Sequence, residues 1–195
     1  MTTPFSVCVY CGSRPGASPA FTESARETGR LIGERGWRLV YGGGRAGLMG
    51  TVADAVLEAG GTAVGVIPRS LVDKEMAHRR LTELHIVETM HERKQMMAER
   101  ADVFVALPGG IGTFEELFEV WTWRQLGYHD KPVGLLNAAG YYDGLLAFIR
   151  HTEQQGFVQP AQAALVQVEA RPAALLDRLE ALARTATAPD DYQRI

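Results

Sequence analysis

Two glycine-rich segments contain the residues with the clearest chemical potential. Segment 108–116 reads Pro-Gly-Gly-Ile-Gly-Thr-Phe-Glu-Glu, and segment 42–47 reads Gly-Gly-Gly-Arg-Ala-Gly. A glycine loop between a strand and a helix lets a phosphate approach backbone N–H groups and the positive end of the helix dipole. One such loop often reflects only tight packing, but two in one chain favour a nucleotide or another phosphorylated ligand.

Segment 108–116 also places a carboxylate, Glu116, where it can face the sugar of a bound nucleoside monophosphate. A carboxylate there can orient a water molecule and stabilise positive charge that develops at the anomeric carbon. The plainer interpretation is a capping box, with Thr113 as the N-cap and Glu116 closing the first helical turn. Spacing alone favours capping. Three glycines within four positions exceed what a cap needs, however, and indicate a ligand against the backbone.

Segment 42–47 fits the dinucleotide fingerprint G-x-G-x-x-G, but its confirming feature is missing. An acidic residue is expected about 20 positions later, at the end of the next strand. That strand ends Ile67-Pro68-Arg69 instead, so an NADP enzyme stays only a minor alternative. The Walker pattern G-K-[ST] does not occur, which argues against hydrolysis of nucleoside triphosphates. Neither an Asp-rich set nor a pair of suitably spaced histidines indicates a metal, so we expect no metal site.

Composition narrows the class of protein. The chain has 195 residues, 46% of them hydrophobic and 22% charged, and a net charge of -3. We therefore expect a folded protein that does not bind nucleic acid, since a basic excess is lacking. We also expect no membrane span and no secretory signal. Two cysteines, Cys8 and Cys11, form no disulfide framework and are interpreted as packing residues in a cytoplasmic protein.

The elements that must position these loops alternate along the chain. Apolar, β-branched runs predict strands at 5–10, 37–41, 62–67, 84–87, 101–107, 133–136 and 165–168. Helices are predicted between them, one starting after Ser18, one after Thr89 with Glu92 completing a capping box, and one over 113–126. No hairpin signal separates consecutive strands. The pattern predicts a doubly wound, Rossmann-like α/β domain over 1–184, with a parallel sheet, helices on both faces and a frayed tail over 185–195.

The motif P-G-G-x-G-T-x-x-E of segment 108–116, together with Met90-His91-Glu92-Arg93-Lys94 upstream, resembles the LONELY GUY (LOG) family. Its members are cytokinin riboside 5′-monophosphate phosphoribohydrolases, many of them labelled lysine decarboxylase-like. Cys11-Gly12-Ser13 and Gly47-Leu48-Met49-Gly50 support the resemblance, which covers roughly residues 7–155.

The resemblance implies cleavage of the N-glycosidic bond of N6-modified adenosine 5′-monophosphate, giving free base and ribose 5-phosphate. It implies a homodimer or larger assembly that needs neither a metal nor an organic cofactor. Arg93 and Glu116 match the catalytic pair. With the glycine loops, the candidate substrate-binding residues are Gly12, Ser13, Gly43, Gly44, Glu75, Lys94, Gly109, Gly110, Ile111, Gly112, Thr113, Phe114, Glu115 and Thr122.

Two further alternatives stay open beside this function. The same residues could cleave unmodified AMP, or the chain could be a nucleotide carrier without catalysis. Lysine decarboxylation would need pyridoxal phosphate on a Schiff-base lysine, and Lys74, Lys94 and Lys131 show no arrangement suited to it. Without the resemblance, Arg93 would be interpreted as an exposed helix residue.

Overall fold

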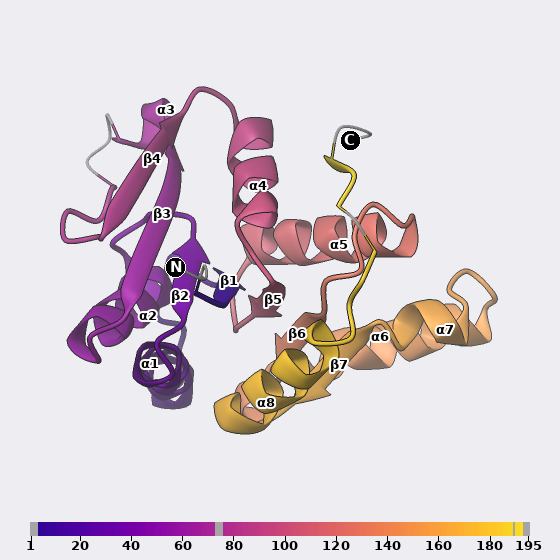
Figure 1. The fold of residues 1–195 in the computed structure, drawn as a ribbon. Helices are drawn as coiled ribbons and strands as arrows, with labels where there is room; N and C mark the ends of the chain where they lie inside the picture. The colour runs from indigo at the N-terminus through magenta and orange to yellow at the C-terminus, as the bar shows by residue number, and fades with distance from the viewer. Residues whose placement is uncertain (1–3, 73–75, 189, 193–195) are drawn as a thin grey trace.

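A parallel sheet forms the centre of the structure, which is a computed structural model describing residues 4–72, 76–188 and 190–192. Within these residues seven strands lie in the order β4-β3-β2-β1-β5-β6-β7, and every pairing is parallel (Figure 1). This confirms the predicted doubly wound sheet. The strands are β1 (Ser6–Tyr10), β2 (Arg38–Tyr41), β3 (Thr62–Pro68), β4 (Glu83–Val87), β5 (Val103–Ala106), β6 (Val133–Leu136) and β7 (Val166–Glu169).

Helices connect the strands and cover both faces of the sheet. The short α3 lies in the segment 68–80, where the sequence predicts a loop with one helical turn, whereas α7 was not predicted. Within the described ranges, the helices lack the length and the continuous apolar surface that crossing a lipid bilayer would need. The helices are α1 (Pro19–Glu34), α2 (Gly47–Glu58), α3 (Arg69–Val72), α4 (Met90–Glu99), α5 (Ile111–Gln125), the 3-10 turn η1 (Ala138–Gly140), α6 (Asp143–Gln154), α7 (Pro160–Ala163) and α8 (Pro172–Ala183).

Two apolar layers result from the alternation of side chains along the strands. Val7 and Val9 of β1 belong to the layer that includes residues of α1, α2 and α8. Cys8 belongs to the opposite layer, beside residues of α4 and α5, while Cys11 returns to the first. The two cysteines are free and buried on opposite sides of the sheet, which confirms that they are packing residues. Burial raises the pKa of the Cys8 thiol to about 12.

The order of the strands reverses between β1 and β5. The chain builds outward from β1 through β2, β3 and β4, then returns to place β5 on the other side of β1. Tyr10 and Ala106, at the carboxyl ends of β1 and β5, are register partners. Loops that leave such neighbouring strand ends in opposite directions open a crevice where α/β proteins bind ligands. Both the Gly12 turn and the Pro108 loop start here.

The C-terminal segment, which the sequence predicts to be frayed, packs on the domain where the structure describes it. The Asp130 carboxylate accepts hydrogen bonds from the Thr187 and Ala188 amides at 2.7 and 2.8 Å. The Tyr192 ring is 6% exposed, and its centroid lies 6.0 Å from that of Trp123. These anchors are single residues without helical or strand periodicity, so pattern reasoning does not detect them.

Candidate active site

The Gly12 turn after β1 and the Pro108 loop after β5 touch each other at the carboxyl edge of the sheet. The Gly12 amide donates to the Pro108 carbonyl at 3.1 Å, and the Leu48 amide donates to the Gly12 carbonyl at 3.0 Å. A Cβ atom at Gly12 would lie 3.0 Å from the Arg14 backbone oxygen and 3.3 Å from the Gly109 Cα. A side chain at Gly12 would therefore push the loops apart, and glycine keeps them joined as one rim.

A cavity of about 380 Å³ opens beside this rim. Residues 12–16 and 108–110 form one part of its lining. Phe21, Leu48 and Tyr141 form the apolar wall, and the ring centroids of Phe21 and Tyr141 lie 5.3 Å apart, edge to face. A cavity of this size and mixed character suits a small-molecule ligand. The predicted residues Gly12, Ser13, Gly109 and Gly110 line it, while Arg93 and Glu116 do not.

The loop after β5 leads into the N-terminus of α5. The Phe114 amide donates to the Gly110 carbonyl at 3.1 Å, so the amides of Ile111, Gly112 and Thr113 precede the first intrahelical bond. Gly110 and Gly112 have open space where a Cβ atom would stand. The first turn of α5 therefore offers N–H groups and the positive helix end to an anion.

The helix begins earlier than predicted, and this corrects the capping interpretation. Gly110, in an extended conformation, is the N-cap of α5, and as a glycine it has no side chain that could cap the first turn. Thr113 is thus not the N-cap, and its buried side chain occupies the space beside Gly109, where a Cβ atom would collide with it. Glu116 does not close the first turn either. The run of glycines lets the helix start at Ile111, two residues before the threonine.

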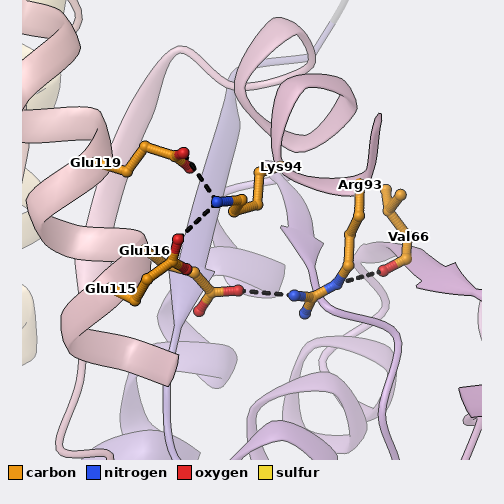
Figure 2. Close-up of polar contacts among 6 residues, drawn as sticks. All are labelled: Val66, Arg93, Lys94, Glu115, Glu116 and Glu119. Carbon is orange, nitrogen blue, oxygen red and sulfur yellow. Dashed lines mark hydrogen bonds and ion pairs between the residues drawn. The ribbon is translucent and has the colours of Figure 1, made fainter. Parts of the chain in front are cut away.

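The Glu116 side chain is instead paired with Arg93 of α4. Arg93 Nη1 donates to Glu116 Oε1 at 2.9 Å, and Arg93 Nε donates to the Val66 carbonyl at 3.1 Å (Figure 2). Both Arg93 and Glu116 are 9% exposed. The interpretation of Arg93 as an exposed helix residue is therefore wrong. The structure brings the two predicted catalytic side chains together at the carboxyl end of β3.

Two local features place Arg93 there. The predicted capping box is confirmed: Thr89 Oγ1 accepts from the Glu92 amide and Glu92 Oε2 accepts from the Thr89 amide, each at 3.1 Å. This fixes the start of α4 one turn before Arg93. At Gly42, a Cβ atom would collide with the Arg93 guanidinium. Gly42, the first residue of segment 42–47, therefore has a packing role, because only a residue without a side chain leaves room for Arg93.

Burial dominates the electrostatics of the pair. It raises the pKa of the Glu116 carboxyl above its ordinary value, because the charged form loses water, while the positive charge and hydrogen bond of Arg93 act in the opposite direction. The nearby Glu115 also raises that pKa. Glu116 is therefore a carboxyl whose charge depends on its immediate neighbours.

Lys94 and Glu115, both predicted to contact the substrate, are paired with each other. Lys94 Nζ donates to Glu115 Oε1 at 2.6 Å and to Glu119 Oε1 at 2.8 Å. Glu119 was not predicted as a site residue. Its spacing in the sequence could have indicated it. Glu119 follows Glu115 by four residues, and residues four apart on a helix share a face.

Other predicted residues lie apart from this pair. Gly43 and Gly44 are buried, and their backbones pair with His78 and Ala77. Phe114 is half-buried, with its ring edge to face with Tyr142, whereas Thr122 is exposed further along α5. Glu75 lies outside the described residues.

Tyr141 is a second residue that was missed. Its hydroxyl donates to the Gly109 carbonyl, and its ring lines the cavity. No sequence signal connects it with Gly109, which lies 32 positions away. A distant residue of this kind becomes part of the rim only through the fold.

The chain is similar to known proteins over most of its length. Residues 49–179 match a family model described as "Possible lysine decarboxylase". A cytokinin riboside 5′-monophosphate phosphoribohydrolase of Rhodococcoides fascians is 54% identical over 160 residues, which cover 82% of this chain and 81% of that protein. The cytokinin riboside 5′-monophosphate phosphoribohydrolase LOG5 of Arabidopsis thaliana is 49% identical over 175 residues, which cover 90% of this chain and 77% of that protein.

Solved structures share the fold. A Moco carrier protein from Chlamydomonas reinhardtii superposes with a TM-score of 0.72 at 24% identity, covering 94% of this chain and 99% of that one. At this identity the likeness extends to the fold alone. The sequence matches are far stronger, and on them this chain belongs to the LONELY GUY family, the family of the cytokinin riboside 5′-monophosphate phosphoribohydrolases.

Proposed function

We propose that this chain hydrolyses the N-glycosidic bond of N6-modified adenosine 5′-monophosphate to the free base and ribose 5-phosphate. The observation that carries the proposal is the buried pair of Arg93 and Glu116, next to a helix N-terminus able to hold a phosphate. The named activity of relatives at about 50% identity supports the substrate class.

The phosphate is assigned to the first turn of α5, at the amides of Ile111, Gly112 and Thr113. Glu116 lies four residues beyond Gly112, about 6 Å along the helix axis. That rise is comparable to the reach from the 5′-phosphate to C1′ within one nucleotide. A phosphate held at the helix start therefore brings the anomeric carbon to the Glu116 carboxylate.

The proposed reaction is dissociative. The C1′–N9 bond breaks and its electron pair leaves with the purine, which takes up a proton from solvent. The Glu116 carboxylate stabilises the oxocarbenium-like sugar and orients a water molecule. The water oxygen bonds to C1′, and its proton passes to Glu116. Arg93 anchors the substrate, and between turnovers its positive charge compensates the negative charge of the Glu116 carboxylate.

The described lysines do not fit pyridoxal phosphate chemistry. A Schiff-base lysine must lose its proton to attack a carbonyl. Burial lowers the pKa of Lys94, but its bonds to Glu115 and Glu119 outweigh this and raise the pKa above its ordinary value. Lys131 pairs with Asp190 at 2.6 Å. Each is thus paired with carboxylates, and the description "lysine decarboxylase" suits neither.

A homodimer acting in the cytoplasm is part of the proposal. The edge strand β4 and the start of α4 expose Leu84, Ile86 and Met90, each 38% to 48% exposed, which supports an apolar contact with a second copy. Ile86→Lys should then halve the mass measured by light scattering, while Phe157→Lys, at another exposed site, should not. A wild-type chain of monomeric mass would contradict the dimer.

The deciding experiment measures free base released from isopentenyladenosine monophosphate and from AMP, beside a control without substrate. Release from the modified nucleotide, faster than from AMP, is the expected result. Equal release from both would indicate an AMP nucleosidase. Tight AMP binding without release from either would contradict catalysis and favour a nucleotide carrier.

A further inference from the structure

Two cations of α4 face three carboxylates of α5, and the proposed reaction uses only one pair of them. Beside the pair of Arg93 and Glu116, the Lys94 ammonium lies between the Glu115 and Glu119 carboxylates (Figure 2). We name Lys94 with these two glutamates the ammonium bridge. The two glutamates of the bridge are four residues apart, so they share one face of α5. In the sequence they lie on either side of Glu116.

The ammonium bridge is partly shielded from water. The Lys94 side chain is 15% exposed, that of Glu119 is 21% exposed and that of Glu115 is 51% exposed. Ion pairs weaken as solvent and salt screen them. Glu119 is therefore the less screened partner and the one that restrains Lys94 more strongly, whereas the Glu115 contact lies at the surface.

The bridge also supplies polar contacts between the two helices. The backbone of α4 lies nearest to β3 and β4. Its later residues Met97 and Ala98 share an apolar layer with Leu117 and Val120 of α5. Within the described residues, every hydrogen bond or ion pair between α4 and α5 comes from Arg93 or Lys94. The part of α4 that carries Arg93 is thus held to α5 by ions.

We infer that Glu119 is a positioning residue: by holding Lys94, it keeps α4 where the Arg93 guanidinium reaches the Glu116 carboxylate. This inference rests on the proposed function of that pair. It differs from the assignment that the family resemblance implies, in which Lys94 contacts the nucleotide. In a positioning role Lys94 and Glu119 act together and neither needs to touch the substrate.

Kinetics separate the two roles. Glu119→Met and Lys94→Met should each lower kcat for base release about fivefold, the scale of a partly buried ion pair, and change the Kd for AMP less than about twofold. Lys94→Arg keeps the charge and should restore most of the rate. Glu180→Met, which removes the pair between Glu180 and Arg184 on α8, is the matched control and should behave as the wild type.

Two kinetic outcomes would overturn the inference. One is a Lys94→Met variant that binds AMP more than about tenfold more weakly while Glu119→Met binds it normally, since that is the pattern of a phosphate contact. The other is a Glu119→Met variant with the kcat of the wild type. Either result would leave Glu119 without a positioning role.

A readout without turnover keeps the test independent of the proposed function. The Arg93 Nε proton is bonded to the Val66 carbonyl in a buried setting, so its exchange with water, followed by NMR, should be slow in the wild type. Glu119→Met and Lys94→Met should speed it several-fold, and Glu180→Met should not. Unchanged exchange in the first two would refute positioning. A wild-type chain that releases no base would instead refute only the hydrolase function.

Discussion

Arg93 and Glu116 are 23 positions apart in the chain, and their side chains meet at 2.9 Å between two helices. Neither helix alone could place such a pair, since α4 is set by its own capping box and α5 by a glycine loop. Each partner is 9% exposed, so removing one leaves the other buried without its counter-charge.

Replacing Glu116 by Gln should nearly abolish catalysis while the protein stays folded. The amide keeps the shape of the side chain and an oxygen for the bond from Arg93, but it cannot take the proton of the attacking water. We expect base release to fall at least about 100-fold with AMP binding retained. Steady-state rates and AMP titration measure the two quantities. Near-normal turnover would show that the carboxylate has only a structural role.

Replacing Arg93 by Met should destabilise the fold. The buried Glu116 carboxylate then loses its counter-charge, which typically costs about 3 kcal/mol of unfolding free energy at pH 7. Adding Glu116→Leu should recover part of that loss, because no buried charge is left. Urea denaturation measures the cycle. Arg30→Met breaks a pair whose side chains are about half exposed and serves as the control, with a change within about 1 kcal/mol.

The pH profile of kcat/KM should report the raised pKa of the Glu116 carboxyl. The carboxylate form is lost at a higher pH than for an ordinary glutamate, since burial raises the pKa above the ordinary value of 4.5. The acid limb should therefore fall with an apparent pKa above 4.5. In Lys94→Met the limb should lie higher still, because the Lys94 charge lowers that pKa. A limb below 4.5 would contradict the burial.

Sequence reasoning predicts the strands, most helices and the two loops, because these depend on local patterns. Apolar alternation fixes which side of β1 each residue faces, and the Thr89 capping box fixes the start of α4. It also singles out Glu116, because the glycines before it exceed what a helix cap needs. The start of α5 is where local patterns mislead. The pattern predicts Thr113 as the N-cap, but the flexible backbone of the preceding glycines lets the helix begin at Ile111.

Local sequence patterns do not predict which side chains of the site pair with one another. Whether Lys94 faces a phosphate or Glu119 depends on how α4 sits against α5, which the sheet order decides. Tyr141 reaches Gly109 across 32 positions, and the Asp130 contacts of the C-terminal segment span 57 and 58. Such contacts follow from topology, so they become visible only once the fold is known.

Acid should destabilise the protein through His129, in the segment between α5 and β6. The ring is 2% exposed; its Nε2 donates to the Val120 carbonyl at 3.0 Å, and its Nδ1 accepts from the Lys131 amide at 3.1 Å. Both nitrogens are thus used by the neutral ring. The pKa of His129 is lowered from 6.5 to about 4, mainly by burial. The hydrogen bond with the Val120 carbonyl and the Asp190 charge act against this, while the charges of Lys131 and Arg124 act with it.

Because the unfolded chain protonates His129 near pH 6.5 and the folded chain only near pH 4, the unfolded state binds more protons between these values. Stability contributed by the neutral ring is therefore complete above pH 6.5 and is lost as the pH falls toward 4, by up to about 3 kcal/mol. His129→Gln cannot titrate, so its unfolding free energy should be lower at pH 7 but should fall less steeply between pH 6.5 and 4. His151→Gln, at an exposed position on α6, should keep the wild-type slope. Urea denaturation at pH 7, 6 and 5 gives all three slopes, and equal slopes for the wild type and His129→Gln would rule out this histidine as the source of acid sensitivity.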